Sequence, residues 1–287
     1  MELTQRRLRY RSVLAGDQCV YPASVFDPIS ARIAEDLGFE VGMLAGSIAS
    51  GTVLGAPDLV VLTLTEFAQQ IHRISRAGDL SLMVDADHGY GNALSVMRTV
   101  EELETAGVAA LTIEDTVLPI SFGGSSGDPL ISLEEGVGKM KAALAARRDP
   151  NMVIAGRTSA IRSEGLEGAI RRVKAYEEAG VDAMFLSGAR TREEVETVHA
   201  ATSLPLLLGG AGGELDDRAF LSANGVRIAL QGHLSFQASI TAVYDTLKAL
   251  REGVAPSDLG PNLASAGLIA QVTRRADYDR WSQEFLG

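Results

Sequence analysis

Acidic side chains follow two apolar runs of this sequence, and they are its clearest sign of chemistry. Asp85 and Asp87 come directly after one run, and Glu114 and Asp115 come at the end of the next. Burying a carboxylate costs free energy unless a positive group meets it. One hard cation at converging strand ends would meet both pairs, so the sequence predicts a magnesium site in an enzyme.

Further polar residues stand at the ends of other apolar runs. Gly46 and Ser47 end the second run, Arg157 ends the fifth, and His233 ends the eighth. A guanidinium in this position can hold a substrate carboxylate through two parallel hydrogen bonds. Each residue also has a structural interpretation: the acids as turn, cap or salt-bridge residues, and His233 as the start of the last helix. Their joint occurrence favours a site.

The elements that must position these residues alternate along the chain from about residue 20 to residue 252. The expected strands are 20–25, 41–45, 80–86, 110–115, 152–158, 183–187, 204–208 and 226–230. Amphipathic helices are expected between them, among them 93–106, 133–146 and 166–179. Gly107 and Gly180 follow two of these helices, where a left-handed glycine ends a helix and returns the chain to the sheet.

Near-continuous apolar strands indicate a parallel sheet covered on both faces, and eight strand–helix units are the number that closes a TIM barrel. We predict an α/β fold, a (β/α)₈ TIM barrel, over residues 1–252. A helical extension is expected over 253–287, packing on a partner subunit or on its own barrel, with a helix at 270–285. A doubly wound open sheet is the alternative, but no G-x-G-x-x-G follows the first strand.

Composition narrows the class of partner. A formal net charge of −11 argues against a nucleic acid or an anionic membrane as partner. The single Cys19 excludes an intrachain disulfide and a cysteine-based zinc site, and it is typical of a reducing compartment. The N-terminus has no apolar signal-like region, and no segment approaches the roughly 18 uninterrupted apolar residues of a membrane span. We expect a cytoplasmic protein acting on a small molecule.

Several motifs together resemble the isocitrate lyase/phosphoenolpyruvate mutase superfamily. They are Ala23 to Pro28, Gly46-Ser47, Asp85 to Asn92, Ile113 to Asp115, Gly156 to Thr158, and Ala175 to Asp182. Within the superfamily, Phe122-Gly123, Glu134 to Lys139, and Gln231 to His233 are most similar to the oxaloacetate decarboxylase branch. The resemblance covers nearly the whole chain.

The resemblance implies a barrel whose last helix is exchanged with a neighbour, in a homotetramer built as a dimer of dimers. It also implies Mg²⁺ held directly by Asp85 and reached through water by Asp87 and Glu114, with Mn²⁺ as a substitute left open. The substrate-binding residues that it implies are Gly46, Ser47, Arg157 and His233. The implied substrate is a small dicarboxylate or α-keto acid.

The reaction follows from what the loop after the fourth strand lacks. Residues 117–128 contain no Cys, Lys or His, which argues against the proton transfer that the lyases of the superfamily need. Decarboxylation needs only an electron sink and a proton donor. His233 or a metal-bound water would return the proton, and a purely orienting His233 is equally compatible. We therefore predict Mg²⁺-dependent decarboxylation of oxaloacetate, or a close 3-carboxy-2-keto acid, to pyruvate and CO₂ through an enolate.

Two alternatives stay open. One is a lyase or hydrolase that cleaves a carbon–carbon or carbon–phosphorus bond in a 2-alkylmalate or a phosphonopyruvate-like substrate. For the phosphonate, Asp58 is the nearby catalytic candidate, and it equally suits a cap beside Pro57. The other is a metal-dependent ligand-binding barrel with low turnover. The glycine-rich stretch 209–213 either cradles a phosphate or is a flexible turn, which leaves the identity of the keto acid open.

Overall fold

Eight parallel strands form the centre of the molecule. The computed structural model describes residues 2–120, 122–123 and 129–287. The strands are β1 (Ala23–Ser24), β2 (Val41–Leu44), β3 (Ser81–Asp85), β4 (Ala110–Glu114), β5 (Val153–Thr158), β6 (Ala183–Leu186), β7 (Leu206–Leu208) and β8 (Val226–Ala229). They pair in chain order. All eight expected strands are present, with ends within a few residues of the prediction.

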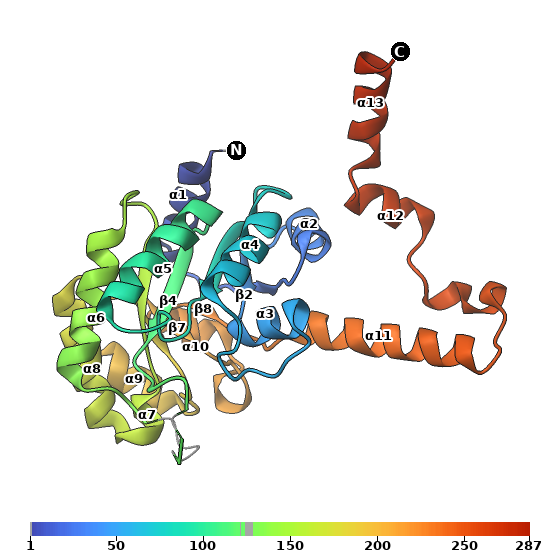
Figure 1. Cartoon of the computed structure of the whole chain (residues 1–287). Helices are drawn as coiled ribbons and strands as arrows, with labels where there is room; N and C mark the ends of the chain where they lie inside the picture. Colours follow the sequence, from blue (N-terminus) through green and yellow to red (C-terminus); the bar gives the residue numbers. More distant parts are fainter. Residues whose placement is uncertain (1, 121, 124–128) are drawn as a thin grey trace.

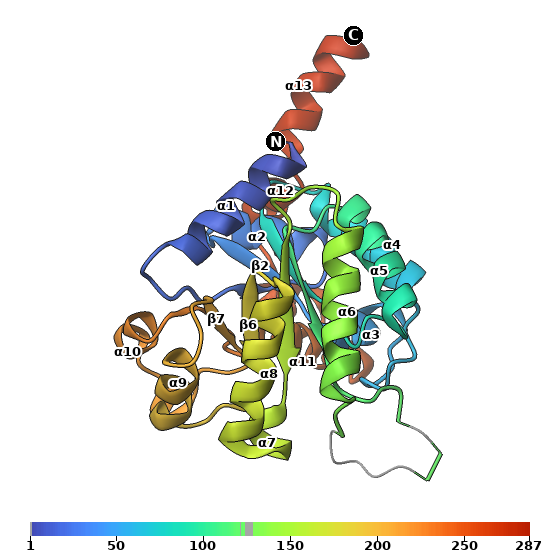
Figure 2. The same ribbon diagram turned by 90° about the vertical axis from the view of Figure 1, so that its left-hand side faces the viewer.

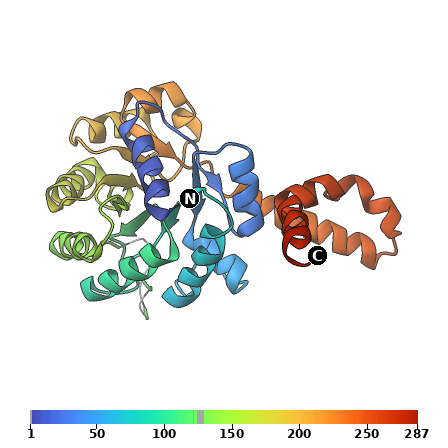
Figure 3. The ribbon, with the colours of Figure 1, turned by 90° about the horizontal axis from the view of Figure 1, so that it is seen from above.

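The sheet curls until its two edges meet. An isolated parallel bridge joins Val20, just before β1, to Ile228 of β8, and the Val20 amide donates to the Arg227 carbonyl at 2.9 Å. The helices lie around the outside of the strands (Figures 2 and 3). The predicted α/β barrel is confirmed.

The barrel helices follow the predicted pattern. They are α2 (Pro28–Asp36), α3 (Gly46–Val53), α4 (Leu64–Ser75), α5 (Ala93–Ala106), α6 (Leu133–Ala146), α7 (Ala160–Ser163), α8 (Gly165–Ala179), α9 (Arg192–His199) and α10 (Arg218–Ala223). Gly107 and Gly180 end α5 and α8 with φ of 103° and 99°. Both left-handed caps that the sequence predicted are therefore present.

Helix α1 (Leu3–Ala15) has no counterpart among the predicted elements. It lies across the end of the barrel where the strands begin (Figure 3). Its Arg7 is buried and donates from Nε to the Val108 carbonyl at 3.1 Å, just before β4. Arg6 of the same helix is also buried. Helix α1 thus closes the N-terminal end of the barrel. The candidate site residues lie at the opposite end, where the strands end.

The C-terminal segment forms an arm. Helix α11 (Leu234–Arg251) leaves the barrel and has no buried residue (Figure 1). The 3₁₀ segment Pro256–Asn262 and the helices α12 (Ala266–Val272) and α13 (Arg275–Phe285) follow it. Across the ranges that the structure covers, no helix has the length and apolarity of a membrane span.

The prediction of a single helix over residues 270–285 is wrong. The chain breaks between α12 and α13 because Arg274 takes a left-handed conformation, with φ of 58°. From there its Nη1 lies 2.7 Å from the carboxylate of Asp36 on α2. Arg32 of α2 also donates to the Val272 carbonyl at 3.0 Å. This part of the tail packs on its own barrel, and the division of the chain at residue 252 stays a prediction.

Candidate active site

Three neighbouring strands bring two acids and one arginine together at the C-terminal end of the barrel. Asp85 ends β3, Glu114 ends β4, and the register pairs Glu114 with Arg157 of β5. Arg157 Nη1 donates a hydrogen bond to Asp85 Oδ2. Arg157 Nε lies 3.0 Å from Glu114 Oε2 as an ion pair, without the alignment of a hydrogen bond. The predicted convergence of these three residues is present in the structure.

An aromatic ring supports the guanidinium. Arg157 Cζ lies 5.3 Å from the centroid of the Phe185 ring, in cation–π range. The register of β5 and β6 pairs the two residues, and Phe185 is buried. A Cβ on Gly209, the first residue of the glycine-rich stretch, would lie 3.2 Å from the Phe185 ring. That glycine therefore leaves room for the ring, and a phosphate-binding role of the stretch stays untested.

Asp87 meets the turn at Gly46. Asp87 has a left-handed backbone, with φ of 47°, and its carbonyl accepts a hydrogen bond from the Glu114 amide at 2.9 Å. A Cβ at Gly46 would lie only 2.6 Å from Asp87 Oδ1. Only a glycine leaves room for the carboxylate at that distance. Ser47, the next residue, is half-buried in the first turn of α3.

The acids repel one another. Burial, followed by the charges of Asp85, Asp58 and Glu114, raises the pKa of Asp87 to about 8. Burial also raises the pKa of Glu114 to about 7, although Arg157 opposes the shift. Desolvation and the charge of Asp85 raise the pKa of Asp58, which is exposed at the rim.

Arg157 is the cation that acts on all four of these carboxylates. Although burial works in the opposite direction, Asp85 and Glu114 raise its pKa, so it remains protonated. One positive charge does not balance the acids when they are ionised. When these acids are ionised, the C-terminal end of the barrel around Arg157, called the mouth below, therefore has more negative than positive charge.

This charge excess and its oxygen donors fit a divalent cation. Mg²⁺ takes one or two carboxylates directly and keeps several waters. Within residues 2–120, 122–123 and 129–287, no three His, Cys, Asp or Glu side chains form a ready ligand set. An ion that keeps its waters does not need such a set. Asp85, Asp87 and Glu114 are thus suited to hold a hydrated hard cation.

His233 lies at the same end of the barrel, between β8 and α11. Its Nδ1 is 2.9 Å from the Ser24 hydroxyl oxygen, at the end of β1. Burial lowers the pKa of His233, and the charge of Asp85 acts in the opposite direction. The predicted histidine is therefore within electrostatic reach of the acids. Ser24 was not predicted as a site residue, because a serine in a strand carries no signal by itself.

Asp115 does not belong to this group. It is fully buried, and its Oδ2 accepts hydrogen bonds from Arg172 Nη1 at 3.1 Å and from the Tyr176 hydroxyl at 2.8 Å. Both donors lie on α8. Of the second acidic pair, only Glu114 contacts Arg157, and grouping Asp115 with it was wrong because successive strand residues point to opposite faces.

A buried lysine was also missed. Lys139 of α6 is 3% exposed and donates from Nζ to the His88 carbonyl at 3.0 Å. It ties the turn that carries Asp87 to a helix. Its position on the apolar face of the predicted helix 133–146 was the available signal.

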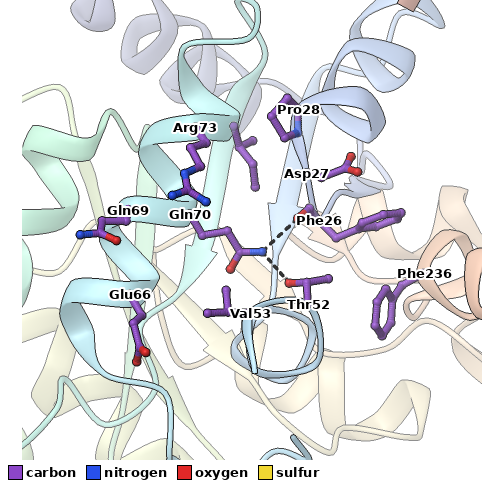
Figure 4. Close-up of a pocket in the computed structure, with 11 residues that line it drawn as sticks. Phe26, Asp27, Pro28, Thr52, Val53, Glu66, Gln69, Gln70, Arg73 and Phe236 are labelled. Atoms are coloured by element: carbon purple, nitrogen blue, oxygen red, sulfur yellow. Dashed lines mark hydrogen bonds between the residues drawn. The ribbon is translucent and has the colours of Figure 1, made fainter. Parts of the chain in front are cut away.

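A separate hollow of about 550 Å³ lies on the flank of the barrel, between α2, α4 and the first turn of α11 (Figure 4). Gln70 crosses it, donating to the Phe26 carbonyl at 2.9 Å and to Thr52 Oγ1 at 2.6 Å. Phe26 and Phe236 meet edge to face, with centroids 5.5 Å apart. None of the acids of the mouth lines this hollow.

Known proteins are similar to this chain in sequence and in fold. The family model described as phosphoenolpyruvate phosphomutase matches residues 11–251. A protein of Bradyrhizobium diazoefficiens named oxaloacetate decarboxylase is 56% identical over 100% of this chain and 99% of its own length. A Rhodopseudomonas palustris protein of the same name is 55% identical over the same shares.

Solved structures agree. Phosphonopyruvate hydrolase in complex with oxalate and Mg²⁺ superposes with a TM-score of 0.85 at 27% identity, covering 98% of this chain and 99% of that one. Oxaloacetate acetylhydrolase bound to 3,3-difluorooxalacetate gives 0.84 at 27% identity, covering 98% and 97%. With its barrel, its acidic mouth and these relatives, the chain belongs to the phosphoenolpyruvate phosphomutase family.

Proposed function

We propose that the protein is an oxaloacetate decarboxylase that depends on Mg²⁺ and releases pyruvate and CO₂. The observation that carries this proposal is the group of buried acids around Arg157 at the barrel mouth. Relatives named oxaloacetate decarboxylase, 53–56% identical over the whole chain, support this reaction over the lyase, phosphonate and ligand-binding alternatives. A solved neighbour that contains oxalate and Mg²⁺ supports the choice of metal.

Asp85 would hold the ion directly, and Asp87 and Glu114 would hold it through water. When bound, a divalent ion polarises the keto oxygen of the substrate, and Mn²⁺ can substitute where a site is built from carboxylates and water. The protein supplies the rest. Gly46 leaves the space that the Asp87 carboxylate occupies. Lys139 of α6 ties the turn that follows β3 to the helix layer through its hydrogen bond to the His88 carbonyl.

Arg157 would bind a substrate carboxylate. The acids contact its Nη1 and Nε, and its Nη2 makes no hydrogen bond with the residues that the structure describes. A guanidinium has five N–H donors, so donors remain for the substrate. Phe185 holds the plane of the group in place. As the C3–carboxylate bond breaks, the positive charge of Arg157 stabilises the negative charge that forms on the keto acid.

Three other residues complete the proposed site. Ser47 and the backbone of the first turn of α3 would donate to the substrate, because helix N-termini present free N–H groups. His233 would face the substrate from the opposite wall and orient it or return a proton to C3. Asp58, which is exposed, stays the catalytic candidate for handling a phosphoryl fragment if the substrate is a phosphonate.

The assay is the formation of pyruvate from oxaloacetate, corrected for the decay that free metal catalyses. We expect chelation to abolish turnover and Mg²⁺ to restore it. Asp85→Ala should lower kcat/KM by about a thousandfold, whereas Asp17→Ala, which removes an exposed acid far along the chain, should have no effect. Turnover by Asp85→Ala at the rate of the parent would refute the proposal.

We further infer a cytoplasmic homotetramer, a dimer of dimers in which α11 is exchanged between barrels. Helix α11 has no buried residue, and its apolar side chains recur at helical spacing: Ile240, Val243, Tyr244, Leu247 and Leu250. An apolar stripe of this kind indicates a protein interface. Light scattering should give four chains for the parent and fewer for Leu247→Lys. The single buried Cys19 supports the reducing compartment.

A further inference from the structure

The inference concerns the seam where the barrel closes, and it rests on the function proposed above. At this seam the residues just before β1 pair with β8 through the bridge between Val20 and Ile228. Ser24, the last residue of β1, faces His233 across it, with Oγ and Nδ1 2.9 Å apart. The contact joins residues 209 positions apart in the chain.

Apart from the contact with Ser24, the His233 side chain makes no hydrogen bond with the residues that the structure describes. His233 stands at the N-cap of α11 and its side chain does not cap the helix. Helix α11 buries no residue, and Phe236 in its first turn anchors it by packing edge to face on Phe26. The residue before His233, Gly232, has φ of 82°, a conformation that only glycine adopts readily. In the described part of the chain, the Ser24 hydroxyl is the side-chain hydrogen-bond partner of the imidazole.

The hydrogen-bond partners in the described part of the chain favour one direction for the Ser24–His233 bond. Nδ1 is the hydrogen-bond partner of the Ser24 hydroxyl among the described residues. If Nδ1 carried the proton and donated it, the serine hydrogen would have no acceptor there. If the hydroxyl donates instead, both groups are satisfied, and the proton of a neutral imidazole is on Nε2.

The other ring nitrogen is open. Nε2 makes no hydrogen bond in the described part of the chain, and it is not one of the buried atoms without a partner, so solvent reaches it. Burial lowers the pKa of His233, which keeps the ring neutral at neutral pH. The negative charge of Asp85 also acts on the ring, so the histidine is within electrostatic reach of the acids at this end of the barrel.

We propose that Ser24 is a positioning residue for catalysis: its hydroxyl donates to Nδ1 of His233 and so presents Nε2–H to an oxygen of the bound keto acid. The role requires a hydroxyl at residue 24, and threonine also provides one. It gives β1 a part in the site that neither its length nor its composition indicates.

The chain offers a matched control at the same seam. Ser235, in the first turn of α11, donates from its hydroxyl to the Ser24 backbone carbonyl at 2.6 Å, and among the described residues it makes no hydrogen bond with the imidazole. Ser235→Ala therefore removes a hydroxyl and a link between the same two segments without removing the partner of Nδ1. Ser24→Thr retains the hydroxyl, and Ser24→Ala removes it.

The first measurement does not depend on turnover. ¹⁵N NMR of the resting protein, with the His233 signals assigned through His233→Asn, should show Nε2 protonated and Nδ1 as an acceptor. Ser24→Ala should shift the Nδ1 resonance, whereas Ser24→Thr and Ser235→Ala should leave it in place. A protonated Nδ1 in the parent, or an unchanged Nδ1 in Ser24→Ala, would overturn the proposal.

The second measurement is kinetic. With oxaloacetate, Ser24→Ala should lower kcat/KM about tenfold, the scale of one hydrogen bond. Ser24→Thr should recover to within threefold of the parent, and Ser235→Ala should also stay within threefold. Equal losses in Ser24→Ala and Ser235→Ala would show a merely structural role and overturn the proposal. If the parent itself does not turn over oxaloacetate, the proposed function fails, and the NMR result still decides whether Ser24 sets the tautomer.

Discussion

The two ends of the barrel treat buried charge in opposite ways. Under α1, at the N-terminal end, acids and arginines are matched: Arg7 Nη1 lies 2.8 Å from Asp149 Oδ2, and Arg11 Nη2 lies 2.9 Å from Asp182 Oδ1. At the mouth, several acids share Arg157.

The pKa shifts of the acids at the two ends are also opposite in direction. Although burial acts to raise it, hydrogen bonds from Arg7, Asn151 and Thr4 hold the pKa of Asp149 well below its usual range. At the mouth, burial and neighbouring acids raise the pKa of Asp87 to about 8. The N-terminal end therefore contributes to stability, whereas the mouth holds charge that costs stability and that the proposed cation would offset.

The largest expected effect is at the matched end. Arg7→Met removes a buried arginine that binds Asp149 and donates to the Val108 and Glu104 carbonyls. Breaking a buried pair by removing one partner costs about 3–5 kcal/mol, so thermal unfolding should occur roughly 10 °C lower. The kcat of the folded enzyme should not change.

The control is Arg73→Met, which replaces an exposed arginine of α4 and should move the unfolding temperature by little. An Arg7→Met protein as stable as the parent would show that the N-terminal pairs do not stabilise the barrel, and the contrast between its two ends would be lost.

The next effect is expected at the mouth, from the metal alone. If the acids are held for a cation, Mg²⁺ at about 100 times its Kd should stabilise the protein by roughly 2.7 kcal/mol, raising the unfolding temperature by about 5–10 °C. A chelator should reverse the shift. Asp85→Ala should abolish it and Asp17→Ala should retain it. An equal shift in Asp85→Ala would place the bound ion somewhere else.

A smaller effect is expected from a change at Asp87, which should lower activity and raise stability at the same time. Asp87→Asn keeps the shape of the side chain and removes a charge that its neighbours disfavour. We expect kcat/KM to fall by roughly 10- to 100-fold, as for residues that hold a metal through water. We also expect the metal-free protein to unfold about 2–4 °C higher, because burial and the neighbouring acids disfavour the charged carboxylate that the change removes.

Calorimetry without metal and the pyruvate assay measure the two effects. The matched change at the other end, Asp182→Asn, should lower the unfolding temperature instead, because that carboxylate pairs with Arg11 and Arg147. Lower stability in both variants would show that the acids of the mouth are as well compensated as those under α1.

The mouth could be predicted from the sequence because parallel strands end at one edge. Asp85, Glu114 and Arg157 each follow an apolar run, and the register of β3, β4 and β5 brings them together. The eight strands and the glycine caps were predictable for the same reason: each is a local pattern. The sequence misled where two adjacent acids diverge, as Glu114 and Asp115 do.

The matched end was not predictable. Nothing in the sequence set the arginines of α1 apart, since their partners are a backbone carbonyl and an acid 101 and 142 positions away. The Ser24–His233 contact joins residues even further apart, 209 positions in the chain. Tertiary partners of this kind leave no periodic trace. The break at Arg274 depends on Asp36, which is likewise distant.

The smallest predicted effect is the pH dependence of the matched end. Because the folded-state pKa of Asp149 lies below that of the unfolded chain, its stabilisation is present above about pH 3.9 and is lost as the pH falls below that value. Asp149→Asn cannot titrate, so the fall in its unfolding temperature between pH 5 and pH 3 should be smaller than that of the parent by roughly 2 °C. Asp17→Asn, at an exposed position, should follow the parent. If Asp149→Asn follows the parent's curve as well, the acids under α1 do not set the acid stability of the barrel, and the mouth must do so.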